Sequence, residues 1–422
     1  MSPSAPGPDV TLVHRPPQSA LTLVLLLAGA CSGGASNRVS TIGRDSAGVP
    51  TVRIPDLRSL AAPVWRTDAA YSTEHEDSLG LGVNAQAAFT PNSELLVTGP
   101  DEIFRFDSSG HLMGRIGRAG DGPGEFRSPF QLLLGADNTV LVGDRAGRLT
   151  RFGNSGEVIR VIPRLPAPAA VELDPIGVLA DGRLLVTYWQ QRPNRGGHPG
   201  IAAGGIERDS APLMVYTATG SANTRLGLWR GLERAQVQLE GEPSRLPLLF
   251  ARSTVYDGRG ARTVIGPSDS MDFSVYADTI VILRLTSPLR VDPPPAQTVD
   301  DQEHAIVEAD PGVGPVYLRA IRSAPAVASL PAVGGVRLDD QGNIWVGAYT
   351  TAREATRHWW IFSDHGVPLG QLDLPALNDP FLPGRVELLD VFNDRLAILR
   401  MTERGEAVVE VRTIRRSPVS AP

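Results

Sequence analysis

The feature that most constrains the fold is a repeat of short apolar runs separated by tight polar turns. Beyond residue 85, an apolar run is followed by a turn of Asp, Asn and Gly, and then by a second apolar run. These turn residues tolerate left-handed dihedral angles and bond to their own backbone, so they close hairpins easily. The turns are Asp107–Gly110, Ala136–Asn138, Asn154–Gly156, Ala180–Gly182, Thr217–Gly220, Asp339–Gly342, Asp364–Gly366 and Asn393–Asp394. Helical periodicity is scarcely visible, so the pattern predicts a nearly all-β chain.

The expected strands fall into groups of four, the spacing of β-propeller blades. Five groups lie at 86–116, 130–162, 171–228, 248–285 and 329–374, and three more strands lie at 386–414. We expect the missing strand from the N-terminal side, around Val64–Arg66 or Thr51–Ile54, because this closure leaves no exposed sheet edge. The sequence predicts one all-β domain at 40–414, a six-bladed β-propeller with four antiparallel strands per blade, followed by a disordered tail at 415–422. Seven blades is the alternative count.

Motifs in the first two groups resemble a known family. Gly117–Phe126 reads Gly-Arg-Ala-Gly-Asp-Gly-Pro-Gly-Glu-Phe, and Pro129, Val140–Asp144 and Arg148–Phe152 follow it. These segments resemble NHL-type and related six-bladed β-propellers, in which a Gly-rich linker precedes a blade and an Asp follows its second strand. Two further segments are similar to bacterial lipoproteins of this group, namely Asp45–Val49 and Leu338–Val346. Because the family includes both recognition scaffolds and enzymes, the resemblance implies the fold and leaves the function open.

The first forty residues have the features of an export signal. An apolar run of eleven residues, Ala20–Ala30, follows His14 and Arg15. It is too short to cross a hydrocarbon core, which needs about 20 residues, but it suits a signal peptide. Ala28–Ala30 before Cys31 resembles the lipobox of bacterial lipoproteins, although Ala28 occupies the usual leucine position. We predict a signal peptide at 1–30, a lipid on Cys31 and a flexible tether at 31–39, which would anchor the protein to a bacterial membrane in the cell envelope. Cleavage of an ordinary secretory signal near Ala30 is the alternative.

Composition excludes several kinds of chemistry. The net charge is −6 without a basic block, so nucleic acid is not an expected partner. All forty basic residues are arginine, which excludes a P-loop lysine and a Schiff-base lysine. Cys31 is the only cysteine, so the mature part has neither a disulfide nor a cysteine nucleophile. No nucleophile elbow and no histidine pair at metal-ligand spacing is present. We therefore expect no catalytic residues, no metal ligands and a monomer.

The long connections between strands favour one end of the domain as a binding face. In a four-stranded antiparallel blade, the loop between the second and third strands and the connection to the next blade emerge on the same side. All the long segments are of these two kinds: 117–129, 190–212, 229–247, 286–328 and 350–358. Loops on a rigid scaffold commonly carry recognition, and arginine suits carboxylate or phosphate groups. The candidate ligand-face residues are Arg118, Asp121, Glu125, Asp144, Arg145, Arg192, Arg195, His198, Arg353, Arg357 and His358.

These observations predict an exported, lipid-anchored, non-catalytic propeller that binds a protein, peptide or glycan on its long-loop face. The alternative is a metal-dependent propeller hydrolase acting on lactones or esters, with calcium or zinc in the central channel. Acids near the channel would then be Asp137, Asp144, Asp181 and Asp339, although most of them fall in turns. A structural envelope component is a third interpretation. Trp345, Trp359 and Trp360 are assigned to the core rather than to a sugar-stacking surface.

Overall fold

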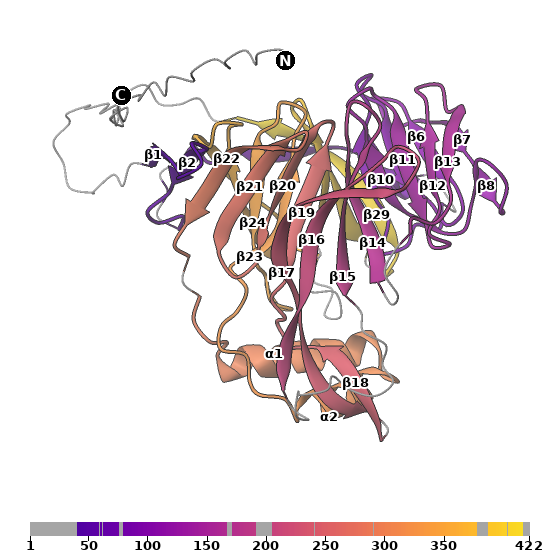
Figure 1. The fold of residues 1–422 in the computed structure, drawn as a ribbon. Coiled ribbons are helices and arrows are strands. Elements are labelled where there is room, and N and C mark those ends of the chain that lie inside the picture. Colours follow the sequence, from indigo (N-terminus) through magenta and orange to yellow (C-terminus); the bar gives the residue numbers. More distant parts are fainter. Residues whose placement is uncertain are drawn as a thin grey trace, which may run out of the picture. The chain divides into compact units, whose positions relative to one another are not determined.

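The chain runs back and forth in short strands because each apolar run ends in a turn. The computed structural model describes residues 40–416 except 59, 61, 76–78, 167–170, 191–204, 240, 290, 378–386 and 403. These residues form twenty-nine strands, two α-helices and one 3-10 helix, η1 (Thr73–His75) (Figure 1). The prediction of a mostly β chain is confirmed. The predicted signal peptide and tether, including Cys31, lie outside the described residues.

The strands pair into sheets of mainly four strands, numbered here in chain order. The first sheet contains β4 (Ala87–Phe89), β5 (Leu95–Thr98), β6 (Ile103–Phe106) and β7 (Leu112–Ile116). The second contains β10 (Pro129–Leu134), β11 (Val140–Asp144), β12 (Leu149–Phe152) and β13 (Val158–Ile162). The third contains β14 (Val171–Val178), β15 (Leu184–Gln190), β16 (Ile206–Tyr216), β17 (Ala222–Leu239) and a fifth strand, β18 (Glu242–Pro247).

The other three sheets follow the same order. The fourth contains β19 (Thr254–Arg259), β20 (Arg262–Pro267), β21 (Met271–Ala277) and β22 (Ile280–Ser287). The fifth contains β23 (Val333–Leu338), β24 (Ile344–Ala348), β25 (Thr356–Phe362) and β26 (Pro368–Pro375). The sixth contains β27 (Leu388–Phe392), β28 (Arg395–Met401), β29 (Ala407–Arg415) and β3 (Arg66–Ser72). The grouping in fours that the turn spacing predicts holds for four of these six sheets, whereas the third has five strands and the fourth has six.

The turns have the backbone conformation that their residues predict. Gly110, Gly156 and Gly182 have φ of 91°, 86° and 81°, and Asn138 has φ of 63°. This left-handed region is open to glycine and is tolerated by asparagine, whereas most side chains are strained there. The turn chemistry therefore sets where each strand reverses.

The sixth sheet is completed from the N-terminal side of the chain. β3 pairs antiparallel with β29, with Thr67 opposite Ile414. The strand that completes the sheet therefore comes from the expected side, but β3 begins only at Arg66, the last residue of the expected segment Val64–Arg66. Val64 instead bridges Gln371 of the fifth sheet. The other candidate, Thr51–Ile54, is wrong as the closing strand. It overlaps β2 (Pro50–Arg53), which forms a hairpin with β1 (Thr41–Arg44) and pairs in parallel with β22, so it extends the fourth sheet instead.

Hydrophobic cores join consecutive sheets. Trp345 and Trp359 pack with Leu388 and Ile398 between the fifth and sixth sheets, and Phe104 of the first sheet shares a core with strands of the sixth. Similar cores lie between the first and second, second and third, third and fourth, and fourth and fifth sheets. Along the same cycle, β4, β10, β14, β19, β23 and β27 contact one another in order, and β27 contacts β4. Each large side chain buried this way contributes about 1.5–3 kcal/mol.

Two helices interrupt the strand pattern, and the sequence analysis missed them. They are α1 (Ala296–Ala309) and α2 (Gly314–Ile321), within the 286–328 connection. On α1 only Gln302 and Ile306 are buried, so its apolar stripe is too narrow to show as a helical period. The sequence does contain helix-start signals at both helices, namely Pro295 directly before α1 and a proline in the first turn of α2.

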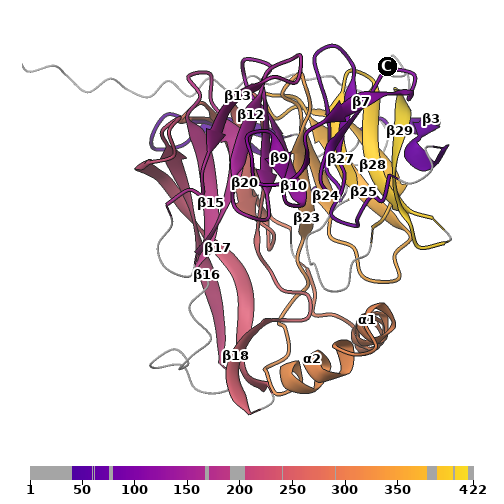
Figure 2. The ribbon, with the colours of Figure 1, turned by 90° about the vertical axis from the view of Figure 1, so that its right-hand side faces the viewer.

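The helices pack against the extended part of the third sheet. We call α1, α2, β18 and residues 229–239 of β17 the accessory layer. Its own hydrophobic core includes Ala235, Val237, Ile306, Leu318 and Ile321. In two perpendicular views the helices and β18 lie together at the far ends of β16 and β17, which extend past the other strands (Figures 1 and 2).

We expect a disulfide to form between β3 and β29 in the double variant Thr67→Cys, Ile414→Cys, made in a Cys31→Ser background. The Ile414 N–H donates to the Asp394 carbonyl at 2.6 Å on the other side of β29, so Thr67 and Ile414 form a non-hydrogen-bonded pair. Such pairs have Cα atoms about 4.5 Å apart, within disulfide reach. Oxidation should raise the melting temperature because a very long loop is closed. Mass spectrometry after proteolysis checks the link. Free thiols in the oxidised double variant would contradict this register, and Thr67→Cys alone is the control.

Candidate functional site

Three of the long connections meet at the accessory layer. Residues 229–247 and 286–328 provide its strands and helices. The 350–358 connection reaches α1 through Arg353, whose Nε lies 3.1 Å from Asp301 Oδ1. Arg192, Arg195 and His198 lie outside the described residues, so their place on this face stays a prediction.

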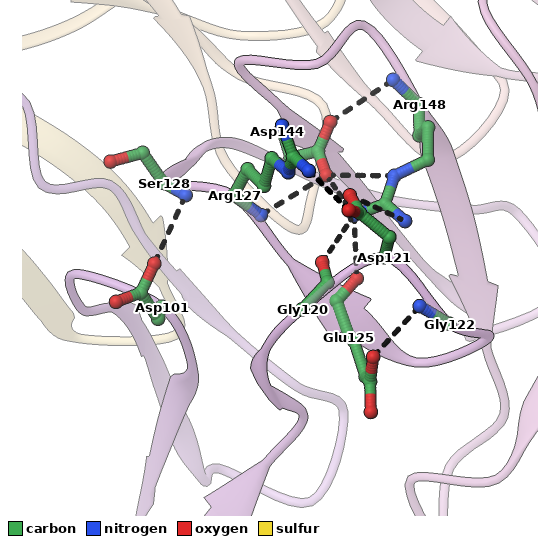
Figure 3. A network of polar contacts seen from close by, with 9 residues as sticks. All are labelled: Asp101, Gly120, Asp121, Gly122, Glu125, Arg127, Ser128, Asp144 and Arg148. Atoms are coloured by element: carbon green, nitrogen blue, oxygen red, sulfur yellow. Dashed lines mark hydrogen bonds and ion pairs between the residues drawn. The ribbon is translucent and has the colours of Figure 1, made fainter.

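The Gly-rich connection at 117–129 is held together by its own charged residues (Figure 3). Arg118 donates from Nε and Nη2 to Glu125 Oε1 at 2.9 and 2.7 Å, and the Gly122 N–H donates to Glu125 Oε2 at 2.8 Å. Asp121 pairs with Arg127. The short strands β8 (Arg118–Ala119) and β9 (Glu125–Phe126) pair in parallel across the loop. Arg118 and Asp121 are exposed, but their charges are matched inside the connection.

Asp144 anchors this connection from the interior. Its carboxylate is 1% exposed and accepts hydrogen bonds from Arg148 Nη2 at 2.7 Å and from the Arg127 N–H at 3.2 Å. Arg148 Nη2 also donates to the carbonyls of Gly120 and Glu125 at 3.0 Å each (Figure 3). Asp144 therefore holds the 117–129 connection from the protein interior, and its carboxylate is not on the surface.

Arg357 is a buried structural residue rather than a surface arginine. It is 3% exposed, and its Nε donates to Glu387 Oε2 at 3.0 Å while Nη1 donates to the Ala348 carbonyl at 3.0 Å. Glu387 is fully buried and also accepts a hydrogen bond from Trp359 Nε1 at 2.9 Å. The sequence analysis placed Arg357 on the ligand face because it belongs to a long connection. Tertiary packing turns its side chain inward, to tie β25 to the segment before β27.

Two other predicted ligand-face residues are at the surface. Arg145 is exposed beside the buried Asp144. The His358 side chain is 34% exposed, its Nδ1 lies 2.6 Å from Asp373 Oδ1, and its ring packs edge-on against Trp360. The three tryptophans assigned to the core are all buried, which confirms that prediction.

A polar cavity of about 270 Å³ lies where the first strands of the six sheets meet. Residues from β4, β10, β14, β19, β23 and β27 all line it. Its charged lining residues are Asp174, Asp257, Arg259, Arg337 and Asp390. The acids named from the sequence as channel candidates (Asp137, Asp144, Asp181 and Asp339) are not among the lining residues.

One ion pair links the fourth, sixth and first sheets across this cavity. Arg259, the last residue of β19, pairs through Nη1 with Asp390 of β27 and donates from Nη2 to the Phe89 carbonyl of β4 at 3.3 Å. Asp390 also accepts hydrogen bonds from the backbone N–H groups of Phe89 at 2.6 Å and Val391 at 2.8 Å. Burial raises the pKa of the Asp390 carboxyl to about 6, although the Arg259 charge opposes this.

A looser ion pair joins the fourth and fifth sheets. Asp257 Oδ2 accepts from the Leu338 N–H at 2.7 Å, and Oδ1 lies 3.9 Å from Arg337 Nη1. That separation is longer than a hydrogen bond. Arg337 instead donates to the carbonyls of Leu388 and Val336 at 2.8 Å each. Burial raises the pKa of Asp257 above its usual value.

A third cluster joins the second, third and fourth sheets. Asp174 accepts hydrogen bonds from Gln131 Nε2 at 2.6 Å and from the Tyr256 hydroxyl. Burial, reinforced by the Asp174 charge, raises the pKa of Tyr256 well above its usual value, so the phenol stays a donor. The sequence analysis missed this interior site. The sequence indicates this site only through single charged residues inside apolar runs, such as Arg337 in β23 and Asp390 in β27.

Within the described ranges, no three His, Cys, Asp or Glu side chains are grouped so that they could hold a metal ion. No helix in the described part of the chain has the length and apolar character needed to cross a membrane.

Comparison with known proteins gives structural similarity only. No protein-family model matches the chain, and no curated protein matches it. A presumed exported protein of Bacteroides fragilis has a similar structure, with a TM-score of 0.46 and 10% identity, over 87% of this chain and 99% of that one. A member of the DUF4221 family from Bacteroides vulgatus has a TM-score of 0.43 and 11% identity, over 90% and 100% of the two chains. Neither similarity identifies a family or a function for this chain.

Arg357 and Arg353 are four residues apart and should respond very differently to the same substitution. We expect Arg357→Met to lower the free energy of unfolding by about 3–5 kcal/mol, because the buried Glu387 loses its counterion. Arg353→Met should cost about 1 kcal/mol or less, because Arg353 is 67% exposed. Denaturant unfolding followed by tryptophan fluorescence measures both. Equal losses in the two variants would contradict the burial of the Arg357–Glu387 pair.

Proposed function

We propose that the six sheets are the blades of a six-bladed β-propeller closed by β3. Two features support this architecture. The shared cores and first-strand contacts follow one cycle that returns from the sixth sheet to the first. β3 supplies the fourth strand of the last sheet from the start of the domain, the closure that protects sheet edges in propellers.

On this scaffold, we propose a non-catalytic binding protein that recognises a protein, peptide or glycan on its long-connection face. The observation that carries the proposal is the accessory layer. Three long connections contribute to it or contact it, and it has its own hydrophobic core, so its outer residues are held on a rigid base. Val313, between the helices, is 58% exposed, and Arg353, which contacts α1 through Asp301, is 67% exposed. Exposed apolar and arginine side chains on a rigid support are common in recognition surfaces.

We also propose that the protein is exported and anchored by a lipid on Cys31. The apolar run Ala20–Ala30, the small residues before Cys31 and the tether after it support this. A diacylglyceryl group with a further acyl chain would hold the domain stably at a membrane, whereas one chain would not.

Replacing Cys31 with Ser should move the protein from the membrane fraction to the soluble fraction of a bacterial host. The physical reason is loss of the only thiol that can accept a lipid. Fractionation with immunoblotting, together with mass spectrometry of the N-terminal peptide, measures the change. Ser32→Ala leaves the thiol intact and serves as the control. A wild-type protein that is cleaved but unlipidated would contradict the anchor and favour the ordinary secretory signal.

The binding proposal is tested by selecting ligands from a random-peptide phage library and a glycan array against the mature protein. We expect selected ligands to lose affinity about tenfold or more on Val313→Asp or Arg353→Glu, because a buried contact at the accessory layer is lost. Glu157→Arg lies in a turn between the third and fourth strands of the second sheet, at the opposite end of the blades, and is the control. Selection of no ligand, or ligands that respond equally to Glu157→Arg, would contradict the proposed face.

A further inference from the structure

We propose that the cavity between the six first strands is a second binding site, which takes a small organic cation carrying an ammonium or guanidinium group. This site is separate from the accessory layer. Either proposal can therefore fail without the other.

The charged residues around the cavity favour a cation as the ligand, because acids outnumber arginines among them. Of the charged residues that line it in the described chain, three are carboxylates, namely Asp174, Asp257 and Asp390, and two are guanidinium groups. With all five ionised, the lining has one excess negative charge. Charge that is removed from bulk water is unfavourable unless it is matched nearby. A positively charged ligand would supply the match.

Four side chains that line the cavity and carry hydrogen-bond donors each donate to at least one protein acceptor. Arg259 donates to Asp390 and to a backbone carbonyl, and Arg337 donates to two carbonyls. Gln131 and Tyr256 both donate to Asp174. A ligand that brings its own donors fits this arrangement better than one that needs donors from the protein.

Asp257 is the group that would receive the ligand. Its side chain is 21% exposed, against 18% for Arg337, 13% for Arg259 and 7% for Asp390. The nearest guanidinium nitrogen of Arg337 is 3.9 Å away, so Asp257 is less closely paired with an arginine than Asp390 is. An ammonium group could approach it at hydrogen-bonding distance and make a charge-assisted bond.

The size and the apolar lining narrow the ligand further. A volume of about 270 Å³ lies just below the usual range of small-molecule pockets, so it suits a small molecule and not a folded partner. Phe130, which is 40% exposed, also lines the cavity. We expect it to contact a short alkyl chain while the charged end of the ligand meets Asp257.

The test uses the mature protein with small primary amines and guanidines, beginning with butylammonium. Butanol and butyrate are matched probes of similar size with no charge and with the opposite charge. We expect calorimetry to show saturable binding of the cations, which should also raise the melting temperature as ligand concentration rises. Butanol and butyrate should have no such effect. Binding of butyrate but not of the amines, or binding of none of the cations, would overturn the proposal.

Variants assign the site. Asp257→Asn keeps an oxygen acceptor for the Leu338 N–H but removes the charge, and should weaken amine binding about tenfold or more. Asp272→Asn, an exposed acid on β21 of the same sheet, is the matched control and should leave affinity unchanged. Equal affinity in the wild type and the folded Asp257→Asn variant would overturn the assignment. So would a tightly held calcium or zinc ion, detected by elemental analysis, whose retention depends on Asp257.

A measurement on the unaltered chain keeps the proposal testable if Asp257→Asn does not fold. Amine affinity should fall as the pH is lowered from 8 to 5. Burial raises the pKa of Asp257, and it raises the pKa of Asp390 to about 6. Asp390 therefore takes up a proton over this pH range while the alkylamine stays charged. Arg259 and Arg337 remain positive throughout, so this protonation removes the excess negative charge of the lining. Affinity that is constant over this pH range would contradict the site.

Discussion

The antiparallel pairing of β3 with β29 is the interaction on which the rest of the structure depends. Without it, the sixth sheet would have three strands and an open edge along β29. β3 directly precedes the first sheet in the chain, so its pairing with the last strand brings the two ends of the domain together. The hydrophobic core between the first and sixth sheets then forms around Phe104 and Val409. The other sheets form mainly between strands that follow one another in the chain, although β2 joins the fourth sheet from a distance. The pairing of β3 with β29 joins residues more than three hundred positions apart.

Buried charges have a related role where the sheets meet. Arg259–Asp390 and Arg357–Glu387 each connect segments from different sheets, and each side chain has further hydrogen bonds to backbone or indole groups. Such pairs add little net stability compared with apolar residues of the same size, but losing one partner is costly. They therefore favour one arrangement of the sheets over nearby alternatives. The cavity differs from the Arg357–Glu387 pair because its three carboxylates outnumber its two guanidinium groups.

The accessory layer and the cavity differ as possible binding places. The accessory layer is built from long connections, and its helices and β18 lie at one end of the fold in both views (Figures 1 and 2). The exposed residues there include the apolar Val313 and, on the adjoining connection, the charged Arg353. The cavity is small, polar and lined by strands that also hold the sheets together. A macromolecular ligand suits the first, and a small charged molecule suits the second. The Gly-rich connection at 117–129 carries the clearest family resemblance. Its charged side chains are instead paired with one another inside the connection.

The sequence by itself determined the strand-rich class, the position of the turns, the grouping of most strands in fours, and that a strand from the N-terminal side completes the sixth sheet. These follow from local chemistry: glycine and asparagine set the reversals, and apolar runs between them set the strands. Only the tertiary structure decided that Arg357 is buried, that 296–321 is largely helical, and that Asp257, Arg259, Arg337 and Asp390 surround one cavity. A charged residue in a short apolar strand gives the same sequence pattern whether its side chain faces solvent or the central cavity. Its environment is set by strands far away in the chain, and no local pattern contains that information.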